Sequence, residues 1–558
     1  MSNAVIYLNP EAYDTSKEHL MGRHSAGESF LKGFLNHGDV SRFYMWDVAN
    51  KGQANLQPLI DSLRPGVEPV YLRREQRAAF SQVGAMHVPT PQIAREAWSR
   101  RPFGSTHYSI TGITHTTATG RIMDAIADLI VAPLEPWDAL ICTSNAVRDS
   151  LTVQIEALRA HFSERMGATA VPQPRLEMIP LGINTDDFVQ DPADGPRWRA
   201  KLGIPDDAIV VLYVGRLNYT SKMNPAPMAM ALERAARLTK KPIHWVLSGW
   251  AASEVVAKNY HDETRSACPS VTYHVVDGRE MDARRTIWSV ADIFLSLSDN
   301  LQETFGLTPL EAMAAGIPVV VSDWNGYRDT VRHNRDGMRV STYTPPAGKG
   351  GDFAYRHANE WDNYEIYVGG VSQTTVVDID EAARAVATLA NDPALRRRMG
   401  DNGRQRAKSA FDWKAIIPQY QALWADLNQR RQAGQAATTR ASRQNPWRLD
   451  PFRMFAGYPT EWLTPSSMIA LTPGEPWKNS EDLLKSPLVR YARAYLPSAQ
   501  ELDQIVSLLS RRPQQTVGQL LSGFADRNRH LFIERGVLLL AKYGRIIIFP
   551  SSNQFGEG

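Results

Sequence analysis

The chain has 558 residues, and its 62 lysines and arginines nearly balance its 59 aspartates and glutamates, which leaves a formal net charge of +3. This balance, with no dominant basic run, argues against a protein that binds nucleic acid through surface charge. With 43% hydrophobic residues in so long a chain, we expect about three domains. The two cysteines, Cys142 and Cys268, indicate neither a disulfide framework nor a cysteine-based metal site, and we expect no bound metal.

The N-terminal region begins with a short apolar run, Ala4 to Leu8, which predicts a strand. It lacks the pattern of a signal peptide, and no apolar run approaches the roughly 20 residues of a membrane-spanning helix. A cytoplasmic location is therefore the expectation. Arg95, Arg100 and Arg101 form a local basic group that could face an acidic lipid or a phosphate, although scattered solvated arginines are the simpler interpretation.

A turn early in the chain carries side chains suited to a polar ligand. Met21 to Gly27 separates the first strand from an apolar helix at residues 30–34, and Gly22 would allow a close approach of the backbone. Arg23 and His24 could contact a phosphate or a second substrate. Glycine is also common wherever a strand turns into a helix, so a purely structural role is the equal alternative.

The run from Ile110 to Thr117 predicts a second polar loop at a strand end, and it contains His115. Its imidazole could hydrogen-bond a hydroxyl group of a ligand. The alternative is a partly buried histidine whose hydrogen bonds are satisfied within the protein.

The run Ile209 to Leu217 predicts a strand that ends in the turn Gly215-Arg216, and Lys222 follows shortly after. Fixed cations at a strand end would neutralise a diphosphate and stabilise the negative charge that develops when such a group leaves. The alternative is two solvated surface cations. It is less favoured because both cations lie beside a strand-end glycine.

The most informative segment runs from residue 293 to residue 321. It predicts a strand at 293–297, a loop, a helix at 307–315 and a second strand at 319–321. The helix begins near Leu307, and its first turn would present unpaired backbone N–H groups to the loop, which favours a diphosphate there. Gly306 lets the backbone approach closely, and Thr304 and Phe305 complete the loop.

Two glutamates frame this turn. Glu303 precedes the helix without an evident capping partner, so its carboxylate could accept hydrogen bonds from sugar hydroxyls, with a solvated loop acid as the alternative. Glu311 fits two interpretations equally well. It could bind a ligand, or it could be the capping-box glutamate of a helix that starts at Thr308 and Pro309.

Taken in chain order, these segments resemble the signature of glycosyltransferase family 4, which comprises retaining nucleotide-sugar transferases of the GT-B fold. The resemblance covers roughly residues 1 to 430. In the family pattern the lysine usually lies one residue nearer the arginine than Lys222 does. Further segments that match the family are Asp138 to Ser144, Ile179 to Phe188, Asn325-Gly326 and Phe411 to Trp413.

The resemblance implies an α/β fold of the GT-B type, with two Rossmann-like doubly wound domains facing a cleft. We expect an acceptor-binding domain at residues 1–190, a nucleotide-sugar-binding domain at 196–409 and a helix crossing between them at 410–430. The polar stretch at 432–444 predicts a linker. Residues 445–558 predict an additional small, mainly helical domain, whose three helices and terminal strand would suit a winged-helix-like module.

The resemblance also implies residue roles and a nucleotide-sugar cosubstrate, a UDP-sugar being the first expectation, with no other cofactor. The catalytic residues would be Arg216, Lys222, Glu303 and His115. The residues expected to bind the donor are Gly22, Gly215, Thr304, Phe305, Gly306, Leu307 and Glu311. Glu303 would bind sugar hydroxyls and Glu311 the ribose, while Arg23 and His24 would face the acceptor.

The acceptor would be a glycan or a lipid-linked molecule, and both peripheral membrane contact and homo-oligomerisation through the C-terminal domain are compatible with the sequence. Two other functions stay open: a non-catalytic scaffold that binds a sugar nucleotide, and a glycan synthase or phosphorylase of the same fold. Arg216, Glu303 and His115 argue against the scaffold, since a binder has no need to stabilise a leaving group. The sequence does not select the donor base, the sugar or the acceptor.

Overall fold

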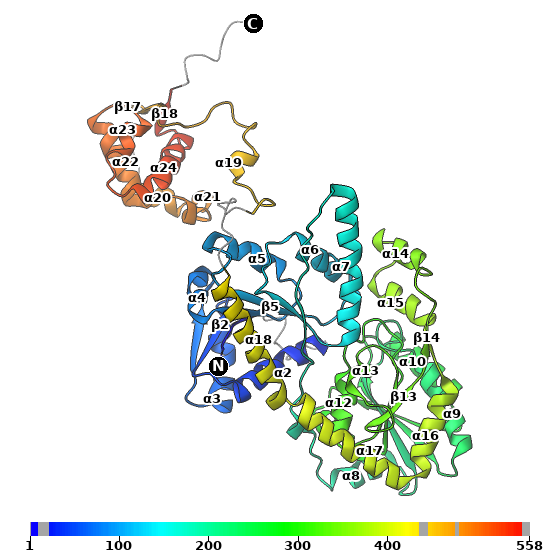
Figure 1. The fold of residues 1–558 in the computed structure, drawn as a ribbon. Coiled ribbons are helices and arrows are strands. Elements are labelled where there is room, and N and C mark those ends of the chain that lie inside the picture. The colour runs from blue at the N-terminus through cyan, green and yellow to red at the C-terminus, as the bar shows by residue number, and fades with distance from the viewer. Residues whose placement is uncertain (1, 9–21, 435–444, 475–478, 550–558) are drawn as a thin grey trace. The chain divides into compact units, whose positions relative to one another are not determined.

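The computed structural model describes residues 2–8, 22–434, 445–474 and 479–549. They form two compact units, residues 1–445 and residues 446–558. The first unit holds two parallel β-sheets of seven and six strands, flanked by helices (Figure 1). None of the described helices is long and apolar enough to cross a membrane. The predicted linker falls largely on residues 435–444, which lie outside the described part of the chain.

The first sheet is parallel throughout, in the order β3-β2-β1-β4-β5-β6-β7. Its central strands are buried on both faces, and they include the buried polar residues His87, Ser109 and Thr111. The strands are β1 (Val5–Tyr7), β2 (Arg42–Trp46), β3 (Glu68–Leu72), β4 (Ala85–Val88), β5 (Ser109–Ile113), β6 (Ala139–Cys142) and β7 (Leu176–Met178). The helices between them are α2 (Gly22–His37), α3 (Gly52–Leu63), α4 (Phe80–Val83), α5 (Ala94–Arg100), α6 (Gly120–Val131) and α7 (Asn145–Met166).

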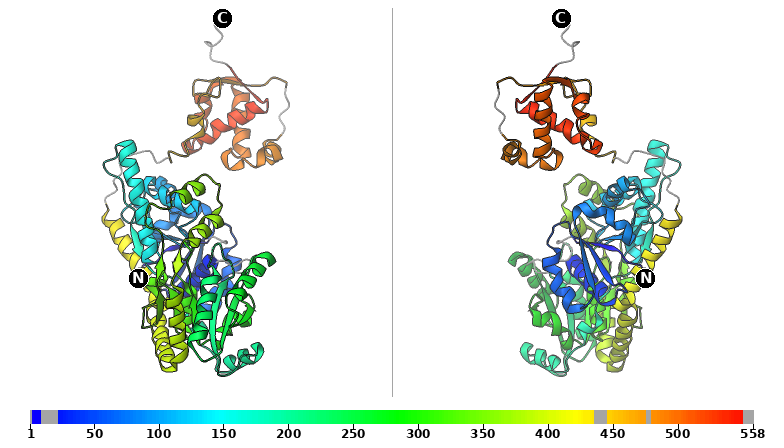
Figure 2. Two further views of the ribbon diagram at one scale, coloured as in Figure 1. Left: turned by 90° about the vertical axis from the view of Figure 1, so that its right-hand side faces the viewer. Right: turned by 90° about the vertical axis from the view of Figure 1, so that its left-hand side faces the viewer.

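The second sheet is also parallel, in the order β10-β9-β8-β11-β12-β13, and the turned views of Figure 2 show helices on either side of it. Its strands are β8 (Ile209–Arg216), β9 (Ile243–Trp250), β10 (Thr272–Asp277), β11 (Ile293–Ser296), β12 (Val319–Ser322) and β13 (Gly337–Val340). The surrounding helices are α8 (Asp194–Leu202), α9 (Pro225–Leu238), α10 (Glu254–Ala267), α11 (Met281–Thr286), α12 (Leu307–Ala314), α13 (Tyr327–Thr330), α16 (Ile379–Asn391) and α17 (Pro393–Arg406).

A helical pair interrupts the second sheet region after β13. Helices α14 (Gly351–Ala358) and α15 (Tyr364–Gln373) lie between the antiparallel strands β14 (Thr342–Tyr343) and β15 (Val376–Val377). No sequence motif marked this insertion. It contributes side chains to the candidate site described below.

Helix α18 (Trp413–Ala433) returns from the second sheet to the first. The Trp413 indole N–H donates to Ser29 Oγ of α2 at 2.6 Å, and the Trp424 indole N–H donates to Thr111 Oγ1 of β5 at 3.1 Å. A Cβ on Gly33 would lie 2.4 Å from the Trp413 ring, so α2 accepts the tryptophan only because it has no side chain there. These contacts fix the C-terminal helix of the unit against its N-terminal sheet.

The second unit is small and mainly helical, with one three-stranded antiparallel sheet in the order β17-β16-β18. Its strands are β16 (Met468–Leu471), β17 (Gln514–Thr516) and β18 (Ile546–Ile548). Its helices are α19 (Pro451–Met454), α20 (Ser480–Lys485), α21 (Pro487–Arg490), α22 (Ala499–Arg511), α23 (Val517–Leu521) and α24 (His530–Lys542).

The predicted fold class is confirmed: two Rossmann-like parallel sheets precede a mainly helical region. The domain boundaries inferred from the sequence stay predictions. One local expectation is wrong. The predicted turn from Met21 to Gly27 is helical from Gly22 onward, because α2 begins there rather than near Phe30. The side chains of residues 22–25, which include Arg23 and His24, lie outside the described part of the chain.

Candidate active site

The carboxyl ends of β8 and β9 approach each other unusually closely. Gly215 pairs with Gly249, and a Cβ on Gly249 would lie 2.0 Å from the Gly215 carbonyl oxygen. Only glycine fits this contact, because no real Cβ tolerates such a distance. The close approach places Arg216, the last residue of β8, at the edge of the sheet where ligands of doubly wound folds bind.

The Arg216 guanidinium contacts the loop that follows β11. With its amide oriented to satisfy both ends, Gln302 accepts from Arg216 Nη2 at 3.0 Å and donates to the Ser221 carbonyl at 2.5 Å and to the Tyr364 hydroxyl at 3.1 Å. A single side chain therefore joins the predicted leaving-group arginine, the loop after β8 and the inserted helix α15.

Lys222 and Glu303 form an ion pair, although 81 positions separate them. Lys222 Nζ lies 2.5 Å from Glu303 Oε2, and the two side chains are 26% and 10% exposed. Asn218 shapes the lysine loop, because its Oδ1 accepts from the backbone N–H groups of Thr220 at 2.9 Å and Ser221 at 2.7 Å. The structure thus brings together two residues that the sequence placed on different parts of a ligand.

Helix α12 begins beyond the two-residue Phe305-Gly306 turn, with Gly306 at its N-cap in the left-handed region at φ +95°. A Cβ on Gly306 would lie 2.3 Å from the Tyr327 ring, so both backbone conformation and space require glycine. No side chain caps the helix, which leaves the N–H groups of its first turn, starting at Leu307, oriented toward the loop. The capping-box interpretation of Glu311 is therefore wrong, because Thr308 lies inside the helix.

Phe305 of this turn and the preceding Thr304 have structural contacts of their own. The Phe305 side chain is 2% exposed and packs edge-on against Phe411 with ring centroids 6.1 Å apart, so only its backbone is available to a ligand. The Thr304 hydroxyl donates to the backbone carbonyl of His115. This bond joins the α12 turn to the loop that follows β5 of the first sheet.

His115 lies half-buried in that loop, close to the core histidine His87. Burial, reinforced by the nearby His115, lowers the pKa of His87 to about 3. Burial also raises the pKa of Tyr364, while a hydrogen bond with Thr116 and the charge of Arg216 oppose that shift. Residues 115 and 116 therefore touch both the α12 turn and the inserted helix α15.

Glu311 lies on α12 and is half-buried. Burial raises the pKa of its carboxyl group to about 7, and the positive charges of Arg284 and Lys222 oppose the shift. Its ionisation near neutral pH makes it a group whose charge a ligand could change.

Three side chains that position the predicted residues were missed by reasoning from the sequence: Gln302, Tyr364 and Glu365. Glu365 Oε2 accepts from Thr220 Oγ1 at 2.6 Å and Oε1 from Ser221 Oγ at 3.2 Å, so α15 holds the loop that carries Lys222. All three act through contacts between distant segments. No local pattern in the sequence could have revealed them.

Of the predicted site residues, the structure groups Arg216, Lys222, Glu303, Thr304 and His115 through the contacts given above. Gly215, Gly306 and Leu307 belong to the same strand end and helix start. Gly22 lies at the first position of α2, and no described contact links it to this group. The roles assigned to these residues stay predictions.

Comparison with known proteins matches residues 194–347 to the family model "Glycosyl transferases group 1". The D-inositol 3-phosphate glycosyltransferase of Streptomyces avermitilis is 25% identical over 280 residues, which cover 49% of this chain and 50% of that protein. The alpha-maltose-1-phosphate synthase of Mycolicibacterium smegmatis is 26% identical over 290 residues, covering 51% and 62%. The matched parts thus span roughly half the length of these relatives.

Among solved structures, the HepE protein of Anabaena in complex with UDP aligns with 76% of this chain and 100% of its own, at 14% identity and a TM-score of 0.48. The matched family segment, residues 194–347, contains β8, β11 and α12. Arg216, Lys222, Glu303 and Glu311 all fall within it. His115 and Gly22 lie outside it.

Proposed function

We propose that the chain is a retaining glycosyltransferase that moves a sugar from a nucleoside-diphosphate sugar to a hydroxyl group of a glycan or lipid-linked acceptor. One observation carries the proposal: Arg216 and the Lys222–Glu303 pair meet beside the uncapped start of α12, inside the segment that matches a glycosyltransferase family. Cations and backbone N–H groups at one strand edge suit a diphosphate.

In the proposed reaction, the bond between the anomeric carbon and the leaving phosphate oxygen breaks while a bond to the acceptor oxygen forms on the same face of the sugar. The acceptor proton passes to the departing diphosphate. The protein therefore needs no general base, and its contribution is positive charge and positioning. Arg216 and Lys222 neutralise the diphosphate as negative charge develops on it.

The donor's sugar and ribose have separate partners in this proposal. Glu303 pairs with Lys222 through one carboxylate oxygen and accepts hydrogen bonds from sugar hydroxyls at the other. The ion pair and the sugar contact are therefore compatible. Glu311 accepts hydrogen bonds from the ribose hydroxyls. His115 hydrogen-bonds a sugar hydroxyl or the acceptor, Gly22 allows a close approach of the backbone to the donor, and Arg23 and His24 are assigned to the acceptor.

A donor screen tests the proposal. The full chain is incubated with UDP-, GDP- and ADP-sugars with varied acceptors, release of the nucleoside diphosphate is measured, and the anomeric configuration of the product is read by proton NMR. We expect release with one base and an unchanged anomeric configuration. Tight donor binding without any turnover would support the scaffold instead, polymer formation would support the synthase, and an inverted product would exclude retention.

A further inference from the structure

Large apolar side chains are exposed mainly in the second unit. Among the described residues 29 such side chains are exposed, and 15 of them lie in residues 446–549, although this unit is much the smaller. Seven fall within sixteen consecutive positions: Trp447, Leu449, Phe452, Met454, Phe455, Tyr458 and Trp462. We refer to residues 447–462 as the aromatic segment. A concentration of this kind marks an interaction surface rather than ordinary surface variation.

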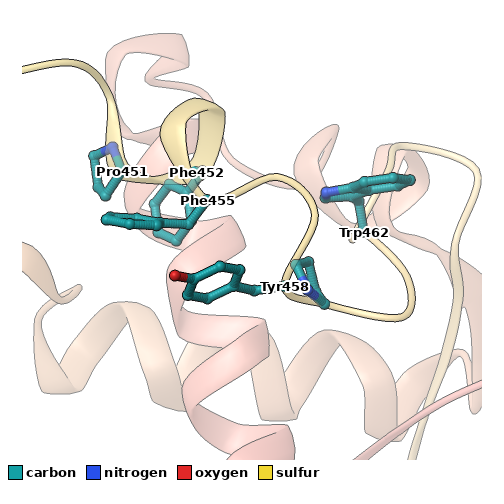
Figure 3. A pocket seen from close by; sticks show the side chains of 6 residues that line it. Pro451, Phe452, Phe455, Tyr458 and Trp462 are labelled. Carbon is teal, nitrogen blue, oxygen red and sulfur yellow. The ribbon is translucent and has the colours of Figure 1, made fainter.

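The aromatic segment forms a shallow groove with a volume of about 520 Å³ (Figure 3). Its lining consists of Pro451, Phe452, Phe455, Tyr458, Pro459 and Trp462. The Phe452, Tyr458 and Trp462 side chains are 73%, 83% and 60% exposed. Among these lining side chains, the polar atoms are one phenol hydroxyl and one indole N–H. A sugar would find too few hydrogen-bond partners here, so the groove suits an apolar occupant.

Cations alternate with the rings of the aromatic segment. Arg448 and Arg453 are exposed, whereas the carboxylate of Asp450 is occupied in capping α19, where it accepts from the backbone N–H of Phe452 at 2.8 Å. A second stretch of the same unit repeats this composition, because exposed Leu488, Tyr491 and Tyr495 alternate with exposed Arg490 and Arg493. The second stretch therefore carries net positive charge among its aromatic rings, whereas the two arginines of the aromatic segment are matched in number by Asp450 and the half-buried Glu461.

We propose that the aromatic segment docks the protein on a lipid bilayer that contains anionic headgroups. Tryptophan and tyrosine favour the boundary between headgroups and acyl chains, because each has an apolar ring and one polar atom. Arginine side chains at the same level pair with lipid phosphates. The bilayer is preferred to a soluble partner because the exposed groups combine Trp, Tyr and Phe with arginine, the composition of an interfacial segment.

Vesicle co-sedimentation of the full chain, without donor or acceptor, tests this proposal independently of the proposed enzymatic function. One set of vesicles contains equimolar phosphatidylcholine and phosphatidylglycerol, and the other contains phosphatidylcholine alone. We expect stronger binding to the anionic vesicles and a decrease with added salt. Replacing Arg448 and Arg453 by glutamine should lower the partition coefficient about fivefold for each arginine.

A paired substitution of rings supplies the sharper test. Phe452→Ser with Tyr458→Ser changes two highly exposed residues, so the fold should survive, and vesicle binding should fall at least about tenfold. The matched control is Val153→Ser with Met166→Ser on α7, whose side chains are 67% and 69% exposed, and it should bind vesicles like the unaltered chain.

Three results would overturn the proposal. The full chain could stay in the supernatant with both kinds of vesicle. The ring variant could bind vesicles as well as the control variant. Light scattering could instead show a dimer that the ring variant abolishes without any vesicle binding, which would assign the aromatic segment to contact between copies of the chain.

Discussion

The two compact units differ in where they place their apolar and polar side chains. In residues 22–434 the central parallel strands are buried on both faces, and charged groups gather where the strands of the second sheet end. In residues 446–549 a small core leaves 15 large apolar side chains exposed. Small units bury a lower fraction of their surface, but size alone does not explain a row of rings with alternating arginines. The contrast assigns the proposed glycosyl transfer to the first unit and the proposed membrane attachment to the second.

Arg216→Ala should give the largest effect and tests whether the chemistry lies in the first unit alone. We expect the turnover number to fall by about 30-fold to 10³-fold, equivalent to about 2–4 kcal/mol of transition-state stabilisation, because one preorganised cation is lost. Vesicle binding should not change. Steady-state kinetics with the preferred donor and the co-sedimentation assay measure the two readouts on the same preparation.

The matched control is Arg234→Ala, whose guanidinium pairs with Asp380 at 2.6 Å on the surface, with side chains 45% and 63% exposed. Such exposed pairs contribute little, so turnover should stay within about twofold. If Arg216→Ala and Arg234→Ala lower turnover equally, the arginine at the end of β8 has no special role in turnover. The assignment of the chemistry to the first unit would then lose its support.

The Lys222–Glu303 pair allows a finer test of the same region. Because the two groups are in contact and are proposed to hold one ligand, Lys222→Met and Glu303→Gln should be non-additive in kcat/KM, with a coupling energy of about 1–3 kcal/mol. A purely structural ion pair would show coupling in the free energy of unfolding alone. Additive effects on kcat/KM would therefore remove the pair from donor binding.

Much of the first unit could be predicted because its strands and helices depend on residues that are close together in the sequence. Strands buried on both faces leave continuous apolar runs, and the runs at residues 209–217 and 293–297 became β8 and β11. The helix expected at residues 307–315 is α12 at Leu307–Ala314, since its start at Gly306 depends on backbone conformation that only glycine adopts readily. The strand-end position of Arg216 followed from the same pattern.

The rest depends on contacts between distant segments. The sequence could not show that Lys222 reaches Glu303, that Phe305 turns into the core, or that Glu365 from an unmarked insertion holds the lysine loop. In the second unit, reasoning from the sequence would place apolar side chains in the wrong environment. Apolar residues at 447–462 would ordinarily be assigned to a core, and only the structure places them outside.

Glu311→Gln tests whether the first unit carries a stability penalty at its candidate site. Burial raises the pKa of this carboxyl group from 4.5 to about 7, so the folded state holds the proton more tightly than the unfolded state. The penalty is absent below pH 4.5, grows as the pH rises to about 7 and is complete above that value. The glutamine variant should be more stable by on the order of 1–2 kcal/mol at alkaline pH only, because its amide has no charge to bury.

Chemical denaturation across this pH range measures the difference, and donor KM at alkaline pH is the second readout. If Glu311 binds the ribose, the more stable variant should bind the donor more weakly. A stability gain that is the same at all pH values would show that ionisation is not its cause.

Ser498→Ala should give the smallest effect and tests whether the second unit is stabilised independently of the first. Ser498 and Glu501 form a capping box at the start of α22, with Ser498 Oγ accepting from the Glu501 N–H at 3.2 Å and Glu501 Oε2 accepting from the Ser498 N–H at 2.7 Å. Losing the hydroxyl should cost about 1 kcal/mol in the unfolding of that unit, with donor turnover unchanged.

The matched change in the first unit is Ser253→Ala, which removes the N-cap of α10, where Ser253 Oγ accepts from the Val256 N–H at 3.3 Å. It should shift the loss of donor turnover on heating, whereas Ser498→Ala should shift the loss of vesicle binding. A pH series separates the units further. Hydrogen bonds from Arg529 and Ser498 lower the pKa of Glu501 to about 2, so its contribution is present above pH 4.5 and disappears as the pH falls toward 2. If both serine variants shift both readouts equally, the two units unfold together. Vesicle binding and donor turnover would then be lost in one unfolding transition.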